Sequence, residues 1–285
     1  MTQTVKTPFI KMHGLGNDFV IFDARVKDIS LSKAQIQGIA DRKHGVGCDQ
    51  LIIIERSQNF LETNFMRIFN ADGSEAEACG NATRCVADIL MQEDGVDQMV
   101  VETLNGALNC SRVSGDLKEE LIRVEMGVPK LEWRDIPLSR ECDTLHLPLK
   151  VAGLGAPVGV NVGNPHCVFF VDNIDRDWDD VAVEAVGHQV LIDPLFPKQT
   201  NVEFAQILAP DHIRMRVRER GVGVTAACGS GACGTVVAAI RRGLTGRSVR
   251  VTLDGGDLII DWLEDTAPIA ITGPVAYVFE GTVLL

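Results

Sequence analysis

The sequence contains no apolar run that approaches the ~18 residues of a membrane-spanning helix. Residues 1–11 also lack a long apolar stretch followed by a small-residue cleavage site, so we expect no secretory signal. Basic residues are in the minority, since 27 Lys and Arg stand against 39 Asp and Glu, a net charge of −12. This acidic balance argues against a nucleic-acid footprint and against binding to an anionic membrane surface. The sequence therefore predicts a cytoplasmic protein that binds neither nucleic acid nor membrane, and it leaves small charged metabolites as possible ligands.

The chain also lacks a Cys-x-x-Cys pair, although it holds eight cysteines among its 285 residues. Cys79 and Cys85, like Cys228 and Cys233, are spaced too widely for the usual zinc knuckle. Eight cysteines are too dilute for a disulfide scaffold, and a reducing compartment keeps most of them as thiols. We therefore expect neither a structural metal nor a disulfide framework.

What the sequence does contain is a large number of short strand-like runs and few helices. Runs rich in β-branched and aromatic residues, bounded by turn residues, predict strands over 9–12, 19–23, 51–55, 65–69, 99–103, 107–113 and 121–126, and again over 158–162, 167–171, 202–208, 213–218, 249–253, 258–262, 269–272 and 275–279. Helices are predicted over 32–41 and 182–190. Two more are predicted directly after Cys79-Gly80-Asn81 and Cys228-Gly229-Ser230, where apolar residues recur at helical spacing.

These two series of elements indicate an internal duplication. Asn17 and Asn164, in similar Gly-Asn segments, lie 147 positions apart, and Cys79 and Cys228, in identical Ala-Cys-Gly triplets, lie 149 apart. Two landmarks that recur at nearly one offset, about half the chain, favour two copies of one unit. We predict an α+β protein of two pseudo-symmetric domains, each a curved, mostly antiparallel sheet or barrel around a central helix. The turn at 127–129 marks the expected boundary.

The repeated cysteines predict a specific chemistry. A cysteine at a helix N-terminus faces backbone N–H groups that have no intrahelical partner, and this favours the thiolate. The same N–H groups bind a carboxylate. If the halves pack about a pseudo-twofold axis, Cys79 and Cys228 meet in a cleft between domains, a common place for a ligand site. One thiolate then removes a proton from a carbon and the opposite thiol returns one to the other face, which predicts racemisation of an amino acid without a cofactor.

Several ordered motifs carry a resemblance to a known family. They are His13-Gly14-Leu15-Gly16-Asn17-Asp18-Phe19, Gly45-Val46-Gly47-Cys48-Asp49-Gln50, Asn70-Ala71-Asp72-Gly73-Ser74-Glu75-Ala76 with Cys79-Gly80-Asn81, Gly163-Asn164-Pro165-His166, Asn201-Val202-Glu203-Phe204, and Glu219-Arg220-Gly221 with Cys228-Gly229-Ser230-Gly231-Ala232-Cys233. From end to end the chain resembles the diaminopimelate epimerase family. The resemblance implies a cofactor-independent isomerase that converts LL- to meso-diaminopimelate in lysine and peptidoglycan-precursor synthesis, acting as a homodimer. It also implies that the last strand joins the first domain, so that the domains are 1–127 plus 275–285 and 128–274.

The resemblance also assigns roles to individual residues. It implies that Cys79 and Cys228 are catalytic and that the substrate is bound by Asn17, Gln50, Asn70, Gly80, Asn81, Asn164, His166, Asn201, Glu219, Arg220, Gly229 and Ser230. Diaminopimelate carries an amino-acid group at each end, so its far end needs a cation and an acceptor, which Arg220 and Glu219 offer. One position departs from the commonest pattern, because Val224-Thr225 stands where Glu-Thr is usual.

Other interpretations of the same residues remain open. Glu219 and Arg220 are also compatible with a surface ion pair, and the asparagines with turn chemistry. Proline or hydroxyproline racemases share the two-cysteine logic without needing the groups for a second charged end. The spacing Gly229-x-Gly231-x-x-Gly234, with Asp254 following, matches a dinucleotide fingerprint and would favour an oxidoreductase. A metabolite-binding protein without activity is the third alternative.

Overall fold

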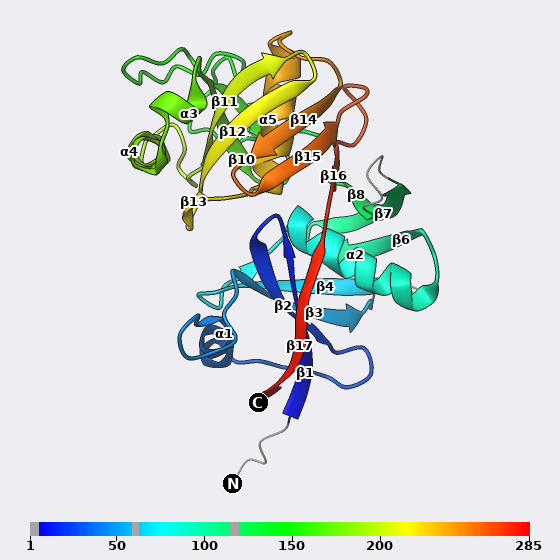
Figure 1. Ribbon diagram of the computed structural model, residues 1–285. Coiled ribbons are helices and arrows are strands. Elements are labelled where there is room, and N and C mark those ends of the chain that lie inside the picture. The colour runs from blue at the N-terminus through cyan, green and yellow to red at the C-terminus, as the bar shows by residue number, and fades with distance from the viewer. Residues whose placement is uncertain (1–5, 59–62, 115–119) are drawn as a thin grey trace. The chain divides into compact units, whose positions relative to one another are not determined.

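The computed structural model describes residues 6–58, 63–114 and 120–285. The chain divides into two compact units (Figure 1). Unit 1 comprises Met1–Val124 and Gly273–Leu285, and unit 2 comprises Glu125–Thr272. In the described part of the chain, no helix has both the length and the apolar character needed to cross a membrane.

Unit 1 is a mixed sheet with two helices. Its strands are β1 (Lys6–Gly14), β2 (Asn17–Asp23), β3 (Gln50–Arg56), β4 (Asn64–Asn70), β5 (Glu75–Ala76), β6 (Gln98–Thr103), β7 (Gly106–Ser114), β8 (Glu120–Glu125) and β17 (Ala276–Leu284), and its helices are α1 (Lys33–Ala40) and α2 (Gly80–Asp94). The sheet runs β17-β1-β2-β3-β4-β6-β7-β8, with β5 added beside β4. Among the described strand pairs of this unit, only β2–β3 and β4–β6 are parallel. The last strand of the chain thus lies antiparallel to the first, as Figure 1 also shows.

Unit 2 repeats this series of elements. Its strands are β9 (Val158–Asn161), β10 (Pro165–Phe170), β11 (Asn201–Ala209), β12 (His212–Glu219), β13 (Gly223–Thr225), β14 (Ser248–Leu253), β15 (Gly256–Asp261) and β16 (Ala270–Gly273), and its helices are α3 (Ile174–Asp177), α4 (Asp180–Leu191) and α5 (Gly229–Arg241). The pairs β10–β11 and β12–β14 are parallel and the other pairs of the unit are antiparallel. The parallel pairs therefore fall at the same two places in both units, which is the pattern of a duplicated fold.

Each sheet curves around one buried helix. Helix α2 contacts β1 near one end of the sheet and β6 and β7 near the other, and α5 contacts β9, β10 and β11 as well as the distant β15. A sheet can touch one helix with both of its ends only if it bends around that helix. Every residue of α2 from Gly80 to Met91 is buried. The predicted α+β class, with a curved sheet around a central helix in each half, is confirmed.

Additional helices cover the outer faces of the sheets. In unit 1, Ile36 and Ile39 of α1 pack on Phe22 and Ile53. In unit 2, the outer face is covered by the segment 173–191, which contains α3 and α4 and is called the arm below. A strand covered on both faces is apolar throughout, and residues 51–54 of β3 accordingly have exposed fractions of 0, 0, 2 and 1%.

Candidate active site

The two repeated cysteines occupy the same position at the start of equivalent helices. Cys79 is the N-cap of α2, with φ −151° and ψ 108°, and Cys228 is the N-cap of α5, with φ −134° and ψ 109°. Each is followed by a buried glycine, which has no side chain beside the first N–H group of the helix. Helix N-termini of this kind stabilise a carboxylate or a thiolate. The prediction that both cysteines begin a buried helix is confirmed.

The sheet register places further polar residues at equivalent strand ends. In unit 1, Phe19 pairs with Gln50, and Gln50 with Asn70. In unit 2, His166 pairs with Asn201, while Val202 pairs with Arg218, which brings the neighbouring Asn201 and Glu219 to the same strand ends. The equivalent pairs are therefore Asn17 and Asn164, Gln50 and Asn201, and Asn70 and Glu219. Each unit thus carries a row of polar side chains near its cysteine.

In unit 1, Asn17 and Asn81 are held near Cys79 by charged neighbours. Asn17 donates from Nδ2 to Asp49 Oδ2 over 3.0 Å and accepts at Oδ1 from Asn81 Nδ2 over 3.1 Å. The Cys79 Sγ lies 3.9 Å from the same Oδ1. Asn81 in turn accepts from Arg84 Nη2 over 2.9 Å, and the Arg84 side chain is fully buried. Asp49 and Arg84 therefore fix both amide orientations.

A second pair of amides in unit 1 leaves one buried acceptor. Gln50 donates from Nε2 to Asn70 Oδ1 over 3.0 Å, and Asn70 donates from Nδ2 to Ser74 Oγ over 3.1 Å. Gln50 Oε1 is buried and has no hydrogen-bond partner among the residues that the structure describes. A buried polar atom of this kind costs stability unless a ligand or water satisfies it. Gln50 therefore offers an acceptor to a ligand.

In unit 2, Cys228 is in contact with a carboxylate. Its Sγ lies 3.0 Å from Glu219 Oε2, and Glu219 Oε1 accepts from Thr225 Oγ1 over 2.6 Å. Burial raises the pKa of the Cys228 thiol well above its ordinary value of 9.0, and the negative charges of Glu219 and Glu203 raise it further. Cys228 is therefore a protonated thiol near neutral pH, and it donates its hydrogen to Glu219.

In the same unit, Asn201 holds the backbone at the start of the loop at 220–223. Its Oδ1 accepts from the backbone N–H of Arg220 over 2.7 Å, whereas its Nδ2 is buried and has no hydrogen-bond partner in the described part of the chain. The exposed Arg220 guanidinium donates from Nη1 to the Lys198 carbonyl over 3.1 Å. Unit 2 therefore offers a buried donor at the position where unit 1 offers the Gln50 acceptor.

Asn164 and His166 form a chain that ends at a buried carboxylate. His166 Nε2 lies 2.8 Å from Asn164 Oδ1, and Nδ1 lies 2.6 Å from Glu203 Oε1. Both ring nitrogens of His166 are thus engaged within the protein. Asn164 itself is half-buried.

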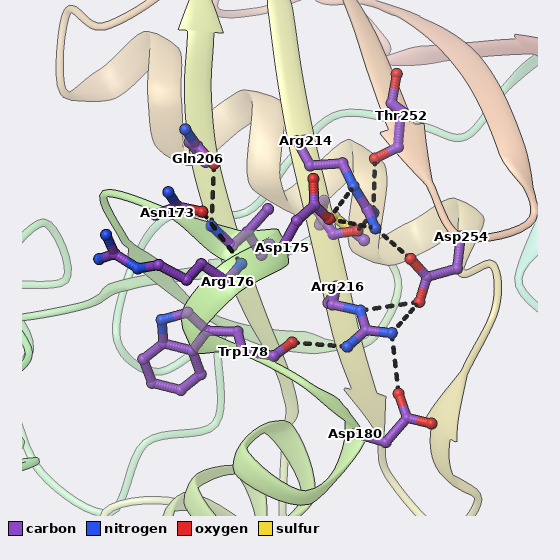
Figure 2. Close-up of polar contacts among 12 residues, drawn as sticks. Asn173, Asp175, Arg176, Trp178, Asp180, Gln206, Arg214, Arg216, Thr252 and Asp254 are labelled. Atoms are coloured by element: carbon purple, nitrogen blue, oxygen red, sulfur yellow. Dashed lines mark hydrogen bonds and ion pairs between the residues drawn. The ribbon is translucent and has the colours of Figure 1, made fainter.

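Asp254, the acidic residue of the alternative dinucleotide fingerprint, belongs to an ion cluster (Figure 2). It accepts from Arg216 Nε over 2.9 Å and also binds Arg214, while these arginines reach Asp180 and Asp175 of the arm. The cluster holds the arm against β12. The glycines at 229–234 follow β13, which runs antiparallel to β12, so the parallel strand-to-helix turn of a dinucleotide site is missing here. The oxidoreductase interpretation has no structural support.

Five side chains of these networks were not candidates from the sequence. Asp49 orients Asn17, Arg84 binds Asn81, Ser74 binds Asn70, Thr225 binds Glu219, and Glu203 binds His166. A signal existed for Glu203, because a charged residue inside the apolar run 202–205 is unusual for a buried strand. Val224, the departure from the usual pattern, packs against the apolar cluster beneath the arm.

Comparisons with known proteins agree with the sequence resemblance. The family model described as "Diaminopimelate epimerase" matches residues 9–132 and 158–278. The protein named diaminopimelate epimerase from Rhodospirillum centenum is 49% identical over 274 residues, which cover 96% of this chain and 91% of that protein. The protein of the same name from Erythrobacter litoralis is 49% identical over 280 residues, covering 98% of this chain and 97% of that one.

Solved structures with low identity share the fold. A probable proline racemase from Agrobacterium radiobacter gives a TM-score of 0.70 at 14% identity, covering 98% of this chain and 93% of that chain. A phenazine biosynthesis protein of the PhzF family from Bacillus anthracis gives 0.69 at 18% identity, covering 99% and 100%. At such identities the likeness concerns the fold alone.

Proposed function

The chain belongs to the diaminopimelate epimerase family, and we propose that it converts LL- to meso-diaminopimelate with Cys79 and Cys228 as its two acid–base groups. The reaction is an isomerisation at one α-carbon and uses no cofactor. It supplies lysine and peptidoglycan-precursor synthesis. The observation that carries the proposal is the repeated cysteine-capped helix, because a two-base inversion needs one such group for each face of the carbon.

Cys228 supplies a proton in this proposal. Its S–H donates to Glu219, and its environment of buried and negatively charged groups favours the thiol. Glu219 is held in turn by Thr225. As the thiol proton moves to the substrate carbon, the sulfur becomes a thiolate that the α5 N-terminus stabilises.

Cys79 is the base in the same step. It is half-buried at the α2 N-terminus, and the buried guanidinium of Arg84 adds positive charge to this half of the site through Asn81. Both features favour a thiolate. The Cys79 thiolate takes the α-proton and becomes a thiol, while the Cys228 thiol protonates the opposite face and becomes a thiolate. The substrate carbon is inverted, and proton exchange resets the two sulfurs.

The substrate's charged groups have partners of suitable polarity. Backbone N–H groups near Gly80, Asn81, Gly229 and Ser230 stabilise the carboxylate of the reacting end as charge develops on it. The buried Gln50 Oε1 accepts from an ammonium group, and Asn201 Nδ2 donates to a carboxylate. Asn17, Asn70 and Asn164 complete the binding set, with His166 and Glu219 adjacent to it. Arg220 binds the distal carboxylate through its forked N–H groups.

We also propose that the protein forms a homodimer and that it acts in the cytoplasm. Strand β17 carries several exposed apolar side chains, Tyr277, Val278, Phe279 and Leu284, with exposed fractions between 45 and 62%. An apolar surface of this kind favours burial against a partner. Light scattering during gel filtration tests the dimer. The cytoplasm is the expected location because the proposed substrate is a biosynthetic intermediate.

The test of the proposed reaction is the activity of single cysteine variants. Purified protein without added cofactor is incubated with LL-diaminopimelate, and the isomers are separated by chiral chromatography. We expect epimerisation in the wild type, none in Cys79→Ala or Cys228→Ala, and unchanged activity in the control Cys142→Ala. Full epimerase activity in either of the first two variants would remove the two-base mechanism, and no activity in the wild type would remove the reaction itself.

A further inference from the structure

A buried acid–imidazole pair lies behind the helix that Cys228 begins. The side chains of His166 and Glu203 have exposed fractions of 0%, and His166 Nδ1 lies 2.6 Å from Glu203 Oε1. Burying such a pair removes both groups from water, and the attraction between them seldom repays that cost in full. Apolar residues of the same size would pack here at no such cost. Stability of the fold therefore does not explain why the pair is buried here, and a role in the site does.

Glycines of α5 make room for both side chains. A Cβ at position 231 would stand 3.1 Å from Glu203 Oε1 and 3.3 Å from Cys228 Sγ, so the carboxylate and the sulfur approach the same turn of the helix. A Cβ at position 234 would stand only 2.9 Å from His166 Cγ. The imidazole therefore lies directly against the α5 backbone. Gly231 and Gly234 thus leave the space that Glu203 and His166 occupy beside α5.

The geometry dictates where the protons of His166 lie. Asn164 Oδ1, at 2.8 Å from His166 Nε2, is an amide oxygen and only accepts, so Nε2 carries a hydrogen. The second contact is satisfied in either of two ways. An ionised Glu203 accepts from a protonated Nδ1, or a protonated Glu203 donates to a bare Nδ1. In both cases Nε2 keeps its hydrogen and donates it to Asn164.

We propose that Glu203 and His166 are positioning residues that hold Asn164 by its amide oxygen and leave its NH2 group to bind the substrate carboxylate. This inference rests on the proposed function for the identity of the ligand. In substrate binding, Glu203 acts through His166 and His166 acts through Asn164, separately from the effect of the Glu203 charge on Cys228.

The equivalent asparagine of unit 1 is held the other way round. Asp49 binds the Nδ2 of Asn17, and its Oδ1 faces Asn81 and Cys79. At two equivalent positions the duplicated fold thus offers an amide oxygen in unit 1 and an amide NH2 in unit 2. An amino acid needs both, an acceptor for its ammonium group and a donor for its carboxylate. The orientation of the amide is set by Asp49 in unit 1 and by His166 with Glu203 in unit 2.

The first test measures the protons of His166 without substrate. The wild-type protein is labelled with ¹⁵N-histidine, and His166 is identified as the ring whose signals change in Glu203→Gln. We expect a protonated Nε2 because the Asn164 oxygen that it faces only accepts. An unprotonated Nε2 would overturn the proposal. The result does not depend on activity, so it is separate from a failure of the proposed function.

The second test is a double-mutant cycle between Glu203 and Asn164. Glu203→Leu and Asn164→Ala are each expected to lower kcat/KM by about 10- to 100-fold, the range for one hydrogen bond to a charged group, and mostly through KM. The KM of the double variant should be no higher than that of Asn164→Ala alone, because Glu203 acts on binding through that amide. Effects on KM that multiply would show that Glu203 acts on binding elsewhere and would overturn the proposal.

Conservative variants keep the test valid if Glu203→Leu does not fold. Glu203→Gln can donate to Nδ1 from its amide, so Nε2 keeps its hydrogen and we expect a KM close to that of the wild type. Asn164→Asp keeps the oxygen that His166 binds but has no NH2, so we expect KM to rise as in Asn164→Ala. A wild-type KM in Asn164→Asp would contradict the proposal. Glu264→Gln, an exposed change of the same chemistry in the same unit, is the control.

Discussion

The hydroxyl of Thr225 is expected to matter for turnover although it touches neither reacting sulfur. It donates to Glu219 Oε1 over 2.6 Å, while the other oxygen of Glu219 accepts from Cys228. Thr225→Val removes the hydroxyl and keeps the shape of the side chain. Glu219 then loses one hydrogen bond to its charged group, which is worth about 1.5–3 kcal/mol.

If this whole free energy is lost from the transition state, kcat/KM falls by about 10- to 150-fold, since ~1.4 kcal/mol corresponds to a factor of ten. The loss should be the same for LL- and for meso-diaminopimelate, because the equilibrium between the two isomers does not depend on the enzyme. Measuring both directions by chiral chromatography thus checks the data internally.

A matched control exists in the same unit. Thr252 Oγ1 also donates to a carboxylate over 2.6 Å, that of Asp257, on the β14–β15 hairpin. Thr252→Val should lose stability to a similar degree in thermal unfolding but keep its kcat/KM. Epimerisation by Thr225→Val at the wild-type rate, or an equal loss of activity in both variants, would refute a role for Thr225 in holding Glu219.

Three further predictions concern charge. Burial raises the pKa of the Cys228 thiol and Glu219 raises it further, so Glu219→Gln should lower that pKa and speed alkylation of Cys228 by iodoacetamide at pH 8. Mass spectrometry measures the rate, and an unchanged rate would contradict the assignment. Arg220→Ala should raise KM by about 10-fold or more with a smaller change in kcat, whereas unchanged constants would refute its distal role. Burial opposes ionisation of Asp18, yet two cationic neighbours outweigh it and lower its pKa from 3.8 to about 2. That lowered pKa stabilises the fold by about 2 kcal/mol above pH ~4, and the contribution disappears as the pH falls towards 2. Asp18→Asn should therefore lower the urea midpoint at pH 7 and show only about half of that deficit at pH 3; equal deficits at both pH values would count against this.

Much of the fold follows from local sequence signals. The strand series, the two cysteine-capped helices and the duplicated order were all predictable, because apolar periodicity and turn residues act over a few positions. The short strands β5 and β13 were not predicted, since two or three residues carry no measurable period. Helix α3, at 174–177, is a single turn capped by the Asn173 side chain and was missed for the same reason.

The sequence was enough to name the candidate residues, whereas the contacts between them could not be predicted from it. Cys79 and Cys228 were apparent from the repeat and the binding residues from the resemblance. Nothing local indicates that Thr225 binds Glu219 or that Glu203 binds His166, because the second contact joins residues 37 positions apart. Such side-chain orientations depend on sheet register and on helix packing, and they decide which atom of an amide faces a ligand.

The two-base claim is tested most directly by the fate of hydrogen in heavy water. The enzyme is incubated with LL-diaminopimelate in D₂O without a cofactor and stopped at low conversion, and isotopes are measured in both isomers. If one sulfur removes a proton and the other delivers a different one, nearly all meso product carries a single deuterium while the remaining LL isomer carries almost none. Product that retains the original hydrogen, or substrate that exchanges as fast as product forms, would contradict the account.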